Sequence, residues 1–212
     1  MKERTGKIFE DLFLNIPKLE ICKSDIMKVT EIISETYNNG GKLLVCGNGG
    51  SASDSQHIVG ELMKGFMLKR PLSKEENEKI NANGGAGLGE KLQGSLPAIS
   101  LVGENALFTA FCNDCDSSMV FAQQVYGLMN KNDTLLCLST SGNSVNVVNA
   151  SYVAKAKGGK VVSVVGESGG KLAEISNASV KLPSIVTPTI QELTLPVYHC
   201  ICAMLESEFF ED

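Results

Sequence analysis

Short apolar segments alternate with helical patterns along most of this chain, and this alternation limits the fold more than any other feature. Four segments have the length of buried strands, at residues 42–46, 98–102, 134–138 and 160–165, and a fifth, weaker one lies at residues 179–182. Segments with helical spacing separate them, which is typical of a parallel sheet covered by helices on both faces. We therefore predict an α/β fold with a five-stranded parallel sheet.

The segment before this alternation is helical in its spacing. Apolar side chains such as Ile8 and Leu12 recur at helical intervals up to about residue 38, and Pro17 divides the segment in two. Gly40 and Gly41 then end the second helix, since glycine adopts the left-handed conformation found at helix ends. Residues 1–40 are therefore predicted to form two helices in front of the sheet.

The length and the net charge of the chain limit the number of domains and the kinds of partner that we expect. A chain of 212 residues fits one domain, which we assign to residues 1–212. The net charge is −5 and no block of Lys or Arg occurs, so neither a nucleic acid nor an anionic membrane is an expected partner. The N-terminus lacks the apolar core of a signal peptide, and no apolar run has transmembrane length. We expect a soluble cytoplasmic protein.

The cysteines give a weak signal. Of seven cysteines, only Cys112 and Cys115 form a C-x-x-C pair. A redox or zinc role for this pair is an alternative, but a single pair without a second one favours reduced thiols packed in the interior.

Residues 71–94 interrupt the alternation. A charge-rich stretch at residues 74–79 is followed by a glycine-rich stretch at residues 81–87. We predict an insertion made of a short solvated helix and a flexible loop. A mobile cover over an active site is the alternative, since long loops are often functional.

The segment that follows the third predicted strand is rich in hydroxyl groups. It contains Ser139, Thr140, Ser141, Gly142 and Ser144, and a helical pattern begins directly after it. Unpaired N–H groups and a partial positive charge at a helix N-terminus favour phosphate there. Ser and Thr are also ordinary helix caps and turn residues, so a purely structural role stays open for this loop taken alone.

A second loop of the same kind follows the first predicted strand, at Gly47, Asn48, Gly49, Gly50 and Ser51. In an open α/β sheet, ligands bind outside the carboxyl ends of the strands, so both loops are expected at one edge. The second loop resembles a dinucleotide-binding pattern, but no acidic residue ends a following strand, so we predict no nucleotide cofactor. Residues 166–172 have the wrong spacing for a P-loop.

Both histidines of the chain lie on helical patterns near other polar groups. His57 and Glu61 are four residues apart and share a helix face, and Gln191 precedes His199 by eight residues. A single histidine on such a helix is more often a hydrogen-bonded core residue. Together, however, a carboxylate and an imidazole can move protons in an aldose–ketose isomerisation, and the same four groups include ligands suited to zinc.

These motifs, in this order, resemble the phosphoheptose isomerases of the sugar isomerase (SIS) family. The resemblance rests on residues 46–51 with His57 and Glu61, on residues 139–144, and on residues 190–192 with His199. It covers nearly the whole chain apart from the insertion. It implies a flavodoxin-like three-layer sandwich and the conversion of sedoheptulose 7-phosphate to D-glycero-D-manno-heptose 7-phosphate.

The resemblance also implies roles for individual residues. Glu61 and His199 would be the acid–base pair, and some members of the family bind zinc at positions that match His57, Glu61, Gln191 and His199. The substrate-binding residues would be Asn48, Gly49, Gly50, Ser51, Glu61, Asn113, Asp114, Ser139, Thr140, Ser141, Ser144 and Gln191. Members form homotetramers with active sites between subunits, which would give residues 1–40 a partner surface.

Three departures from the family pattern bear on the substrate. Thr194 replaces a second histidine that usually follows the glutamine, and Gly60 and Pro188 are also unusual at their positions. Two alternatives follow: an isomerase of another sugar phosphate, and a non-catalytic SIS protein that binds a replication-initiator-type partner or senses a sugar phosphate. The presence of His199 counts against a non-catalytic protein, because such relatives typically lack it.

Overall fold

The computed structural model describes residues 1–210 and contains a five-stranded parallel sheet in the order β2-β1-β3-β4-β5. The strands are β1 (Leu43–Gly47), β2 (Ala98–Ser100), β3 (Thr134–Ser139), β4 (Lys160–Gly166) and β5 (Ala178–Leu182). All neighbouring strands pair in parallel. The predicted fold class is confirmed, and β2 is two residues shorter than the sequence pattern indicated.

Helices surround the sheet in the predicted alternation. They are α1 (Glu3–Asn15), α2 (Lys23–Asn38), α3 (Gly50–Met63), α4 (Lys74–Ala82), α5 (Asn105–Asp114), α6 (Val120–Leu128), α7 (Val145–Ala156), α8 (Gly170–Ile175) and α9 (Thr187–Phe210). The two predicted N-terminal helices are present, and a 3₁₀ helix at Pro17–Cys22 joins them. No helix within residues 1–210 is long and apolar enough to cross a bilayer.

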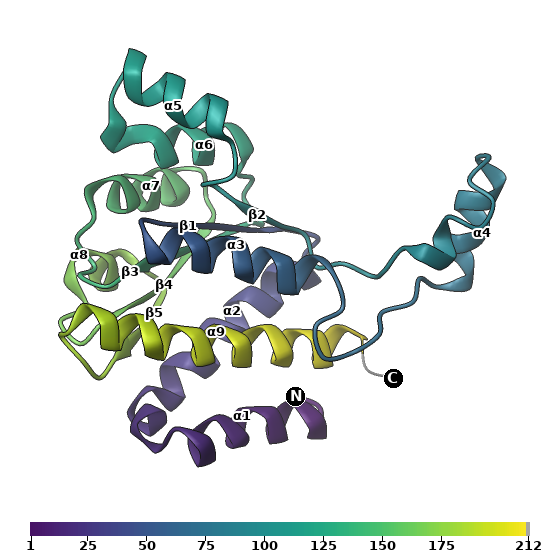
Figure 1. Ribbon diagram of the computed structural model, residues 1–212, viewed down its shortest axis with the longest axis horizontal. Coiled ribbons are helices and arrows are strands. Elements are labelled where there is room, and N and C mark those ends of the chain that lie inside the picture. Colours follow the sequence, from purple (N-terminus) through teal and green to yellow (C-terminus); the bar gives the residue numbers. More distant parts are fainter. Residues whose placement is uncertain (211–212) are drawn as a thin grey trace.

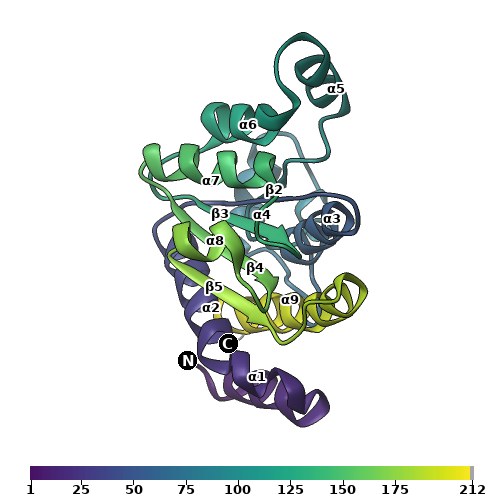
Figure 2. The ribbon, with the colours of Figure 1, turned by 90° about the vertical axis from the view of Figure 1, so that its left-hand side faces the viewer.

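Two apolar cores lie on opposite faces of the sheet, because side chains alternate between the faces along each strand. Leu43 and Val45 pack with α1, α2, α3 and α9, whereas Leu44 and Cys46 pack with α6, α7 and α8. Figures 1 and 2 show the helices stacked on both sides of the sheet. This is the three-layer arrangement that the family resemblance implies.

Helices α3 and α9 pack together on one face and run in the same direction (Figure 1). Gly50 at the start of α3 lies against Gln191 near the start of α9, and the rings of His57 and His199 meet further along. The two helices therefore carry the four predicted acid–base and metal-binding residues along one line of contact.

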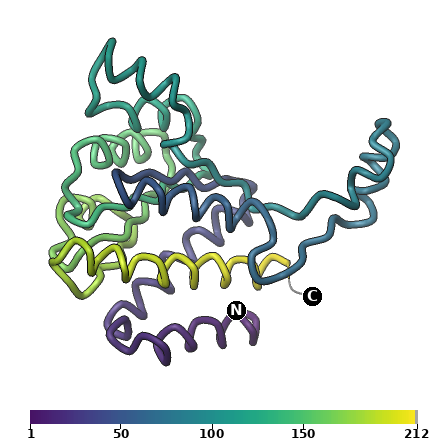
Figure 3. Tube along the Cα trace, viewed as in Figure 1, coloured from purple at the N-terminus to yellow at the C-terminus, as the bar shows by residue number. Residues whose placement is uncertain are grey.

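The predicted insertion is an arm that stands away from the rest of the molecule (Figure 3). It spans residues 71–94, contains α4, and is closed at its root by an antiparallel bridge between Pro71 and Gln93. None of the α4 residues is buried, so the charged stretch is solvated as predicted. The arm leaves the end of α3 and returns just before β2 begins, at the edge opposite the two polar loops. It does not cover those loops.

Candidate active site

The two predicted polar loops meet at the carboxyl edge of the sheet. The loop after β1 leads into α3, and the loop after β3 leads into α7. The amides of Asn48 and Asn146 join them, since each Nδ2 donates to the other's Oδ1 at 2.9 Å. Asn146 was not among the predicted site residues, although it is a polar residue in the first turn of α7.

Hydroxyl groups of the loop after β3 lie close to the N-terminus of α7. Ser139 Oγ and Ser144 Oγ are 3.1 Å apart, and Ser141 Oγ accepts a hydrogen bond from the backbone N–H of Asn143 at 3.1 Å. Ser139 is buried, whereas Ser141 is exposed. Gly142 has a φ of 67°, a conformation that glycine adopts without strain.

The first turn of α8, which follows β4, supports this hydroxyl-rich loop from the side. Lys171 N–H donates to Asn143 Oδ1 at 2.9 Å, and Leu172 N–H donates to the carbonyl of Gly142 at 2.9 Å. A cavity of about 240 Å³ opens beside the two loops; its walls include Thr140, Ser141 and Ser168. The sequence at residues 166–172 is therefore no P-loop, but it shapes the predicted phosphate site.

The start of α3 leaves room for a side chain from α9. A Cβ atom on Gly50 would lie 2.8 Å from Nε2 of Gln191, so Gln191 occupies space that only glycine leaves free. Ser51 is buried beside it. The structure thus brings three of the predicted substrate-binding residues together at one point of the sheet edge.

His57 and Glu61 form the pair that their spacing predicts. His57 Nε2 and Glu61 Oε1 are 3.0 Å apart, and Lys64 Nζ lies 3.0 Å from the other carboxylate oxygen of Glu61. The Glu61 side chain is 12% exposed, against 44% for His57. Glu61 is thus a largely enclosed carboxylate that still reaches solvent.

Tyr198 and Asp54 fix the other side of the His57 ring, and neither residue was predicted. The Tyr198 hydroxyl lies 2.9 Å from His57 Nδ1 and 3.3 Å from Asp54 Oδ1. Tyr198 O–H donates to Asp54 Oδ1, and the tautomer of the His57 ring decides which atom of the Tyr198–His57 contact is the donor. Burial raises the pKa of both Asp54 and Tyr198. The signal missed in the sequence was the polar Tyr198 beside His199 in an apolar helix.

His199 lies next to this network. Its ring centroid is 5.0 Å from that of His57, 4.9 Å from that of Tyr198 and 5.4 Å from that of Phe66. Its Nε2 atom is buried and has no hydrogen-bond partner within residues 1–210. Burial, and then the nearby His57, lower the pKa of His199, while Glu61 opposes this shift. A neutral His199 has a lone pair available to accept a proton.

The four predicted zinc ligands lie on two packed helices, His57 and Glu61 on α3 and Gln191 and His199 on α9. Glu61 Oε1 is engaged with His57 Nε2, and Gln191 lies eight residues from His199, or about 12 Å along α9. Within residues 1–210, no three His, Cys, Asp or Glu side chains are grouped so that they could hold a metal ion. The donor types suit zinc, and a zinc ion at these four residues stays a prediction.

Asn113 and Asp114 lie at the end of α5, on the other face of the sheet from α3. Asn113 Nδ2 donates to Asp114 Oδ1 at 2.8 Å, and both residues are exposed. No hydrogen bond in the described part of the chain joins them to the loops after β1 and β3. The nearby Cys112 and Cys115 are free thiols.

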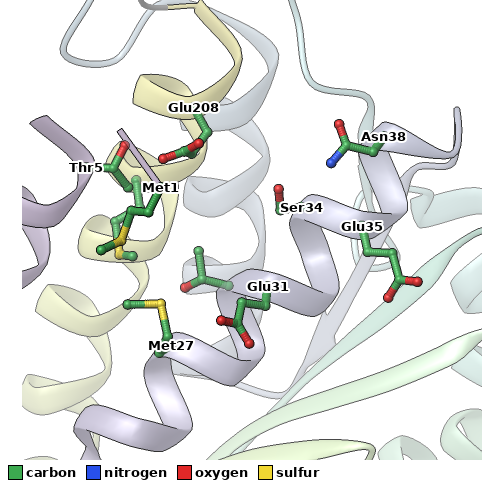
Figure 4. Close-up of a pocket in the computed structure, with 10 residues that line it drawn as sticks. Met1, Thr5, Met27, Glu31, Ser34, Glu35, Asn38 and Glu208 are labelled. Atoms are coloured by element: carbon green, nitrogen blue, oxygen red, sulfur yellow. The ribbon is translucent and has the colours of Figure 1, made fainter. Parts of the chain in front are cut away.

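A further pocket, of about 310 Å³, lies between α1, α2 and α9 (Figure 4). Its lining includes the carboxylates of Glu31, Glu35 and Glu208 and the thioethers of Met1 and Met27. An acidic lining disfavours a phosphorylated ligand. The candidate active site is therefore the sheet edge together with the line of contact between α3 and α9.

Comparisons with known proteins identify the family of the chain. The SIS domain family matches residues 18–77 and 78–166. A phosphoheptose isomerase of Helicobacter pylori is 38% identical over 191 residues, which cover 90% of this chain and 88% of that protein. The structure of a phosphoheptose isomerase from Francisella tularensis matches with a TM-score of 0.75 and 30% identity, over 98% of this chain and 100% of that one.

A second solved structure, of the phosphoheptose isomerase from Neisseria gonorrhoeae, matches with a TM-score of 0.72 and 28% identity, over 96% of this chain and 98% of that one. The match therefore includes α3 and α9 as well as the sheet. The chain belongs to the phosphoheptose isomerase family of SIS-domain proteins.

Proposed function

We propose that this protein is an isomerase that converts sedoheptulose 7-phosphate to D-glycero-D-manno-heptose 7-phosphate. The observation that carries the proposal is the joint presence of a hydroxyl-rich loop at a helix N-terminus and an enclosed Glu61 beside His199. Membership of the phosphoheptose isomerase family supports the choice of sugar.

The phosphate of the substrate would bind at the loop after β3. Ser139, Thr140, Ser141 and Ser144 offer hydroxyl donors there, and α7 adds unpaired N–H groups and the positive end of its dipole. The amide pair of Asn48 and Asn146 holds the loop after β1 against this site. The loop after β1 and Gln191 would then contact the sugar.

Glu61 and His199 would carry out the proton transfers. One of them removes the proton from the carbon next to the ketose carbonyl, which gives an enediol, and returns it to the former carbonyl carbon. The other moves a proton between the two neighbouring oxygens. The lowered pKa of His199 keeps its imidazole neutral near pH 7, the form that can accept a proton.

A second copy of the chain would complete the site. Glu61 lies eleven residues beyond Gly50, or about 16 Å along α3, so the acid–base pair and the phosphate loop are far apart within one chain. Large apolar side chains are also exposed on α1 and near the start of α9, at Leu14, Ile185 and Leu195. These features support a homotetramer, the assembly that the family resemblance implies.

Zinc and a cytoplasmic location stay predictions. A zinc ion would be held by His57, Glu61, Gln191 and His199, and no step above uses a metal. Metal analysis of the protein purified with and without added zinc measures whether the assembled protein binds it.

The proposed function is tested with purified protein and sedoheptulose 7-phosphate. The wild type should form the aldose, and His199→Ala and Glu61→Gln should each lower kcat by about 10²- to 10⁴-fold, the range for a lost acid–base group. Melting temperatures show that the variants are folded. The proposal fails if the wild type turns over no heptose phosphate, with or without zinc. Turnover of a hexose or pentose phosphate alone would keep the reaction and change the substrate.

A further inference from the structure

Glu206 is a fully buried carboxylate near the end of α9, and it binds the segment that follows α3. It accepts hydrogen bonds from the backbone N–H groups of Phe66, Met67 and Leu68 at 2.8, 2.7 and 3.0 Å. It also accepts one from Arg70 Nε at 2.8 Å. A buried carboxylate is tolerated only with such partners. The segment after α3 is thereby fixed to α9.

Arg70 extends this connection to α3 itself. Arg70 is 1% exposed. Its guanidinium donates from Nη1 to the carbonyl of Leu62 at 2.7 Å and from Nη2 to the carbonyl of Glu61 at 3.1 Å. These carbonyls belong to the last turn of α3, where backbone acceptors lack helical partners. A cation also suits the negative end of the helix dipole. Arg70 therefore caps α3 at the residue that carries the proposed catalytic carboxylate.

The same contacts reach both proposed acid–base residues. Arg70 holds the backbone of Glu61, and Glu206 lies seven residues, or about two turns, beyond His199 on α9. We propose that Arg70 and Glu206 are positioning residues for the isomerisation: their buried ion pair sets where Glu61 lies relative to His199. This inference rests on the proposed function of the site.

The ion pair should act on the rate of the chemical step more than on binding. Displacing a reacting group by about 1 Å can lower a rate by about 10²-fold. The predicted phosphate loop lies at the opposite end of α3, close to Gly50, so a shift at the end of α3 leaves that loop in place. A loss of kcat with little change in KM is the signature that separates positioning from a general loss of structure.

The decisive variant is Glu206→Gln, which keeps the size of the side chain and removes its charge. We expect kcat for sedoheptulose 7-phosphate to fall at least about ten-fold while KM stays within about twofold. Amide hydrogen exchange at residues 66–68 should also become faster, because their acceptor is weakened. This second measurement does not depend on activity.

Asp133→Asn is the matched control. Asp133 has a side chain that is 3% exposed, pairs with Lys42 and accepts backbone N–H groups from Lys42 and Asn130. It lies just before β3, at the edge of the sheet opposite the polar loops. We expect a comparable loss of melting temperature with kcat within about twofold of the wild type. A kcat in Glu206→Gln within twofold of the wild type, or an equal loss in the control, overturns the proposal.

Arg70→Lys decides the question if Glu206→Gln does not fold. It leaves a cation beside Glu206 but cannot reproduce the guanidinium's bonds to both carbonyls of α3. We expect a several-fold loss of kcat, and an unchanged kcat overturns the positioning role. An inactive wild type would instead refute the proposed function, whereas an active wild type with unaffected variants refutes only the positioning role.

Discussion

Two regions of the molecule are stabilised by different kinds of interaction. One is the contact between α3 and α9, and the other is the arm at residues 71–94. Arg70 and Glu206, which join the end of α3 to α9, are 136 positions apart in the sequence and buried. In the arm, by contrast, Ser73 and Glu76 cap α4 within three residues of each other and are exposed. The first region depends on the whole fold being formed, whereas the arm depends mainly on its own sequence.

Alanine substitutions at two matched glycines should show the largest difference in kcat/KM between the arm and the rest of the molecule. Gly142 in the hydroxyl-rich loop and Gly87 in the arm both have positive φ, 67° and 73°. A Cβ at Gly142 would overlap the carbonyl oxygen of Gly169, whereas one at Gly87 meets nothing within 4 Å. Gly142→Ala should therefore lower kcat/KM by about 10²-fold or more, because the loop must move.

Gly87→Ala is the control for backbone strain alone. It should cost about 1–2 kcal/mol of local left-handed strain and leave kcat/KM within about twofold. Steady-state kinetics and thermal melts of both variants make the comparison. Similar losses of activity in the two variants would show that the arm is as closely tied to the site as the loop is.

Shortening the arm should change the kinetics and stability of the protein less than Gly142→Ala does. Deleting residues 81–87 removes exposed chain from a region whose helix has no buried residue. The melting temperature should change by less than about 2 °C, which corresponds to roughly 0.5–1 kcal/mol for a chain of this size. We expect KM to change more than stability does. A fall of more than about 5 °C would show that the arm contributes to the stability of the body.

The smallest expected effect is a pH dependence confined to the arm. The Ser73 hydroxyl and backbone N–H lower the pKa of Glu76. A lowered carboxyl pKa stabilises the folded helix above the unfolded value, near pH 4.3, and this contribution disappears as the pH falls through the folded value. Amide exchange in α4 should therefore accelerate at acid pH relative to α3.

Ser73→Ala is the control, since it removes the hydroxyl partner of Glu76. The acid-induced acceleration in α4 should be smaller in this variant. Equal acceleration in the wild type and in Ser73→Ala would mean that the capping box does not set the acid sensitivity of the arm.

The sequence predicts those structural features that depend on the spacing of residues close together in the chain. The strands, the N-terminal helices, the solvated α4 and the pairing of His57 with Glu61 all follow from periodicity or from residues a few positions apart, and the structure contains each of them. The contacts of Asn146, Tyr198 and Arg70 were missed, because their partners lie 98, 141 and 136 positions away and no local pattern links them.

One local signal was available for the buried ion pair. Glu206 directly follows the apolar run at residues 200–205 of α9, and a charge that is buried with such a run needs a buried partner. The identity of that partner depends on how the chain folds back, which spacing alone does not reveal. The roles of Asn113 and Asp114 likewise stay predictions, since no hydrogen bond within residues 1–210 joins them to the polar loops.

The closed root of the arm has a consequence for engineering the protein. The Pro71–Gln93 bridge and the hydrogen bond from Gly94 N–H to the Arg70 carbonyl, at 2.6 Å, bring the two ends of the arm together. A segment inserted between those ends therefore begins and ends at nearly the same point in space. The segment can therefore be exchanged for a reporter domain or an affinity tag whose termini are adjacent, with the sheet and its loops left as they are.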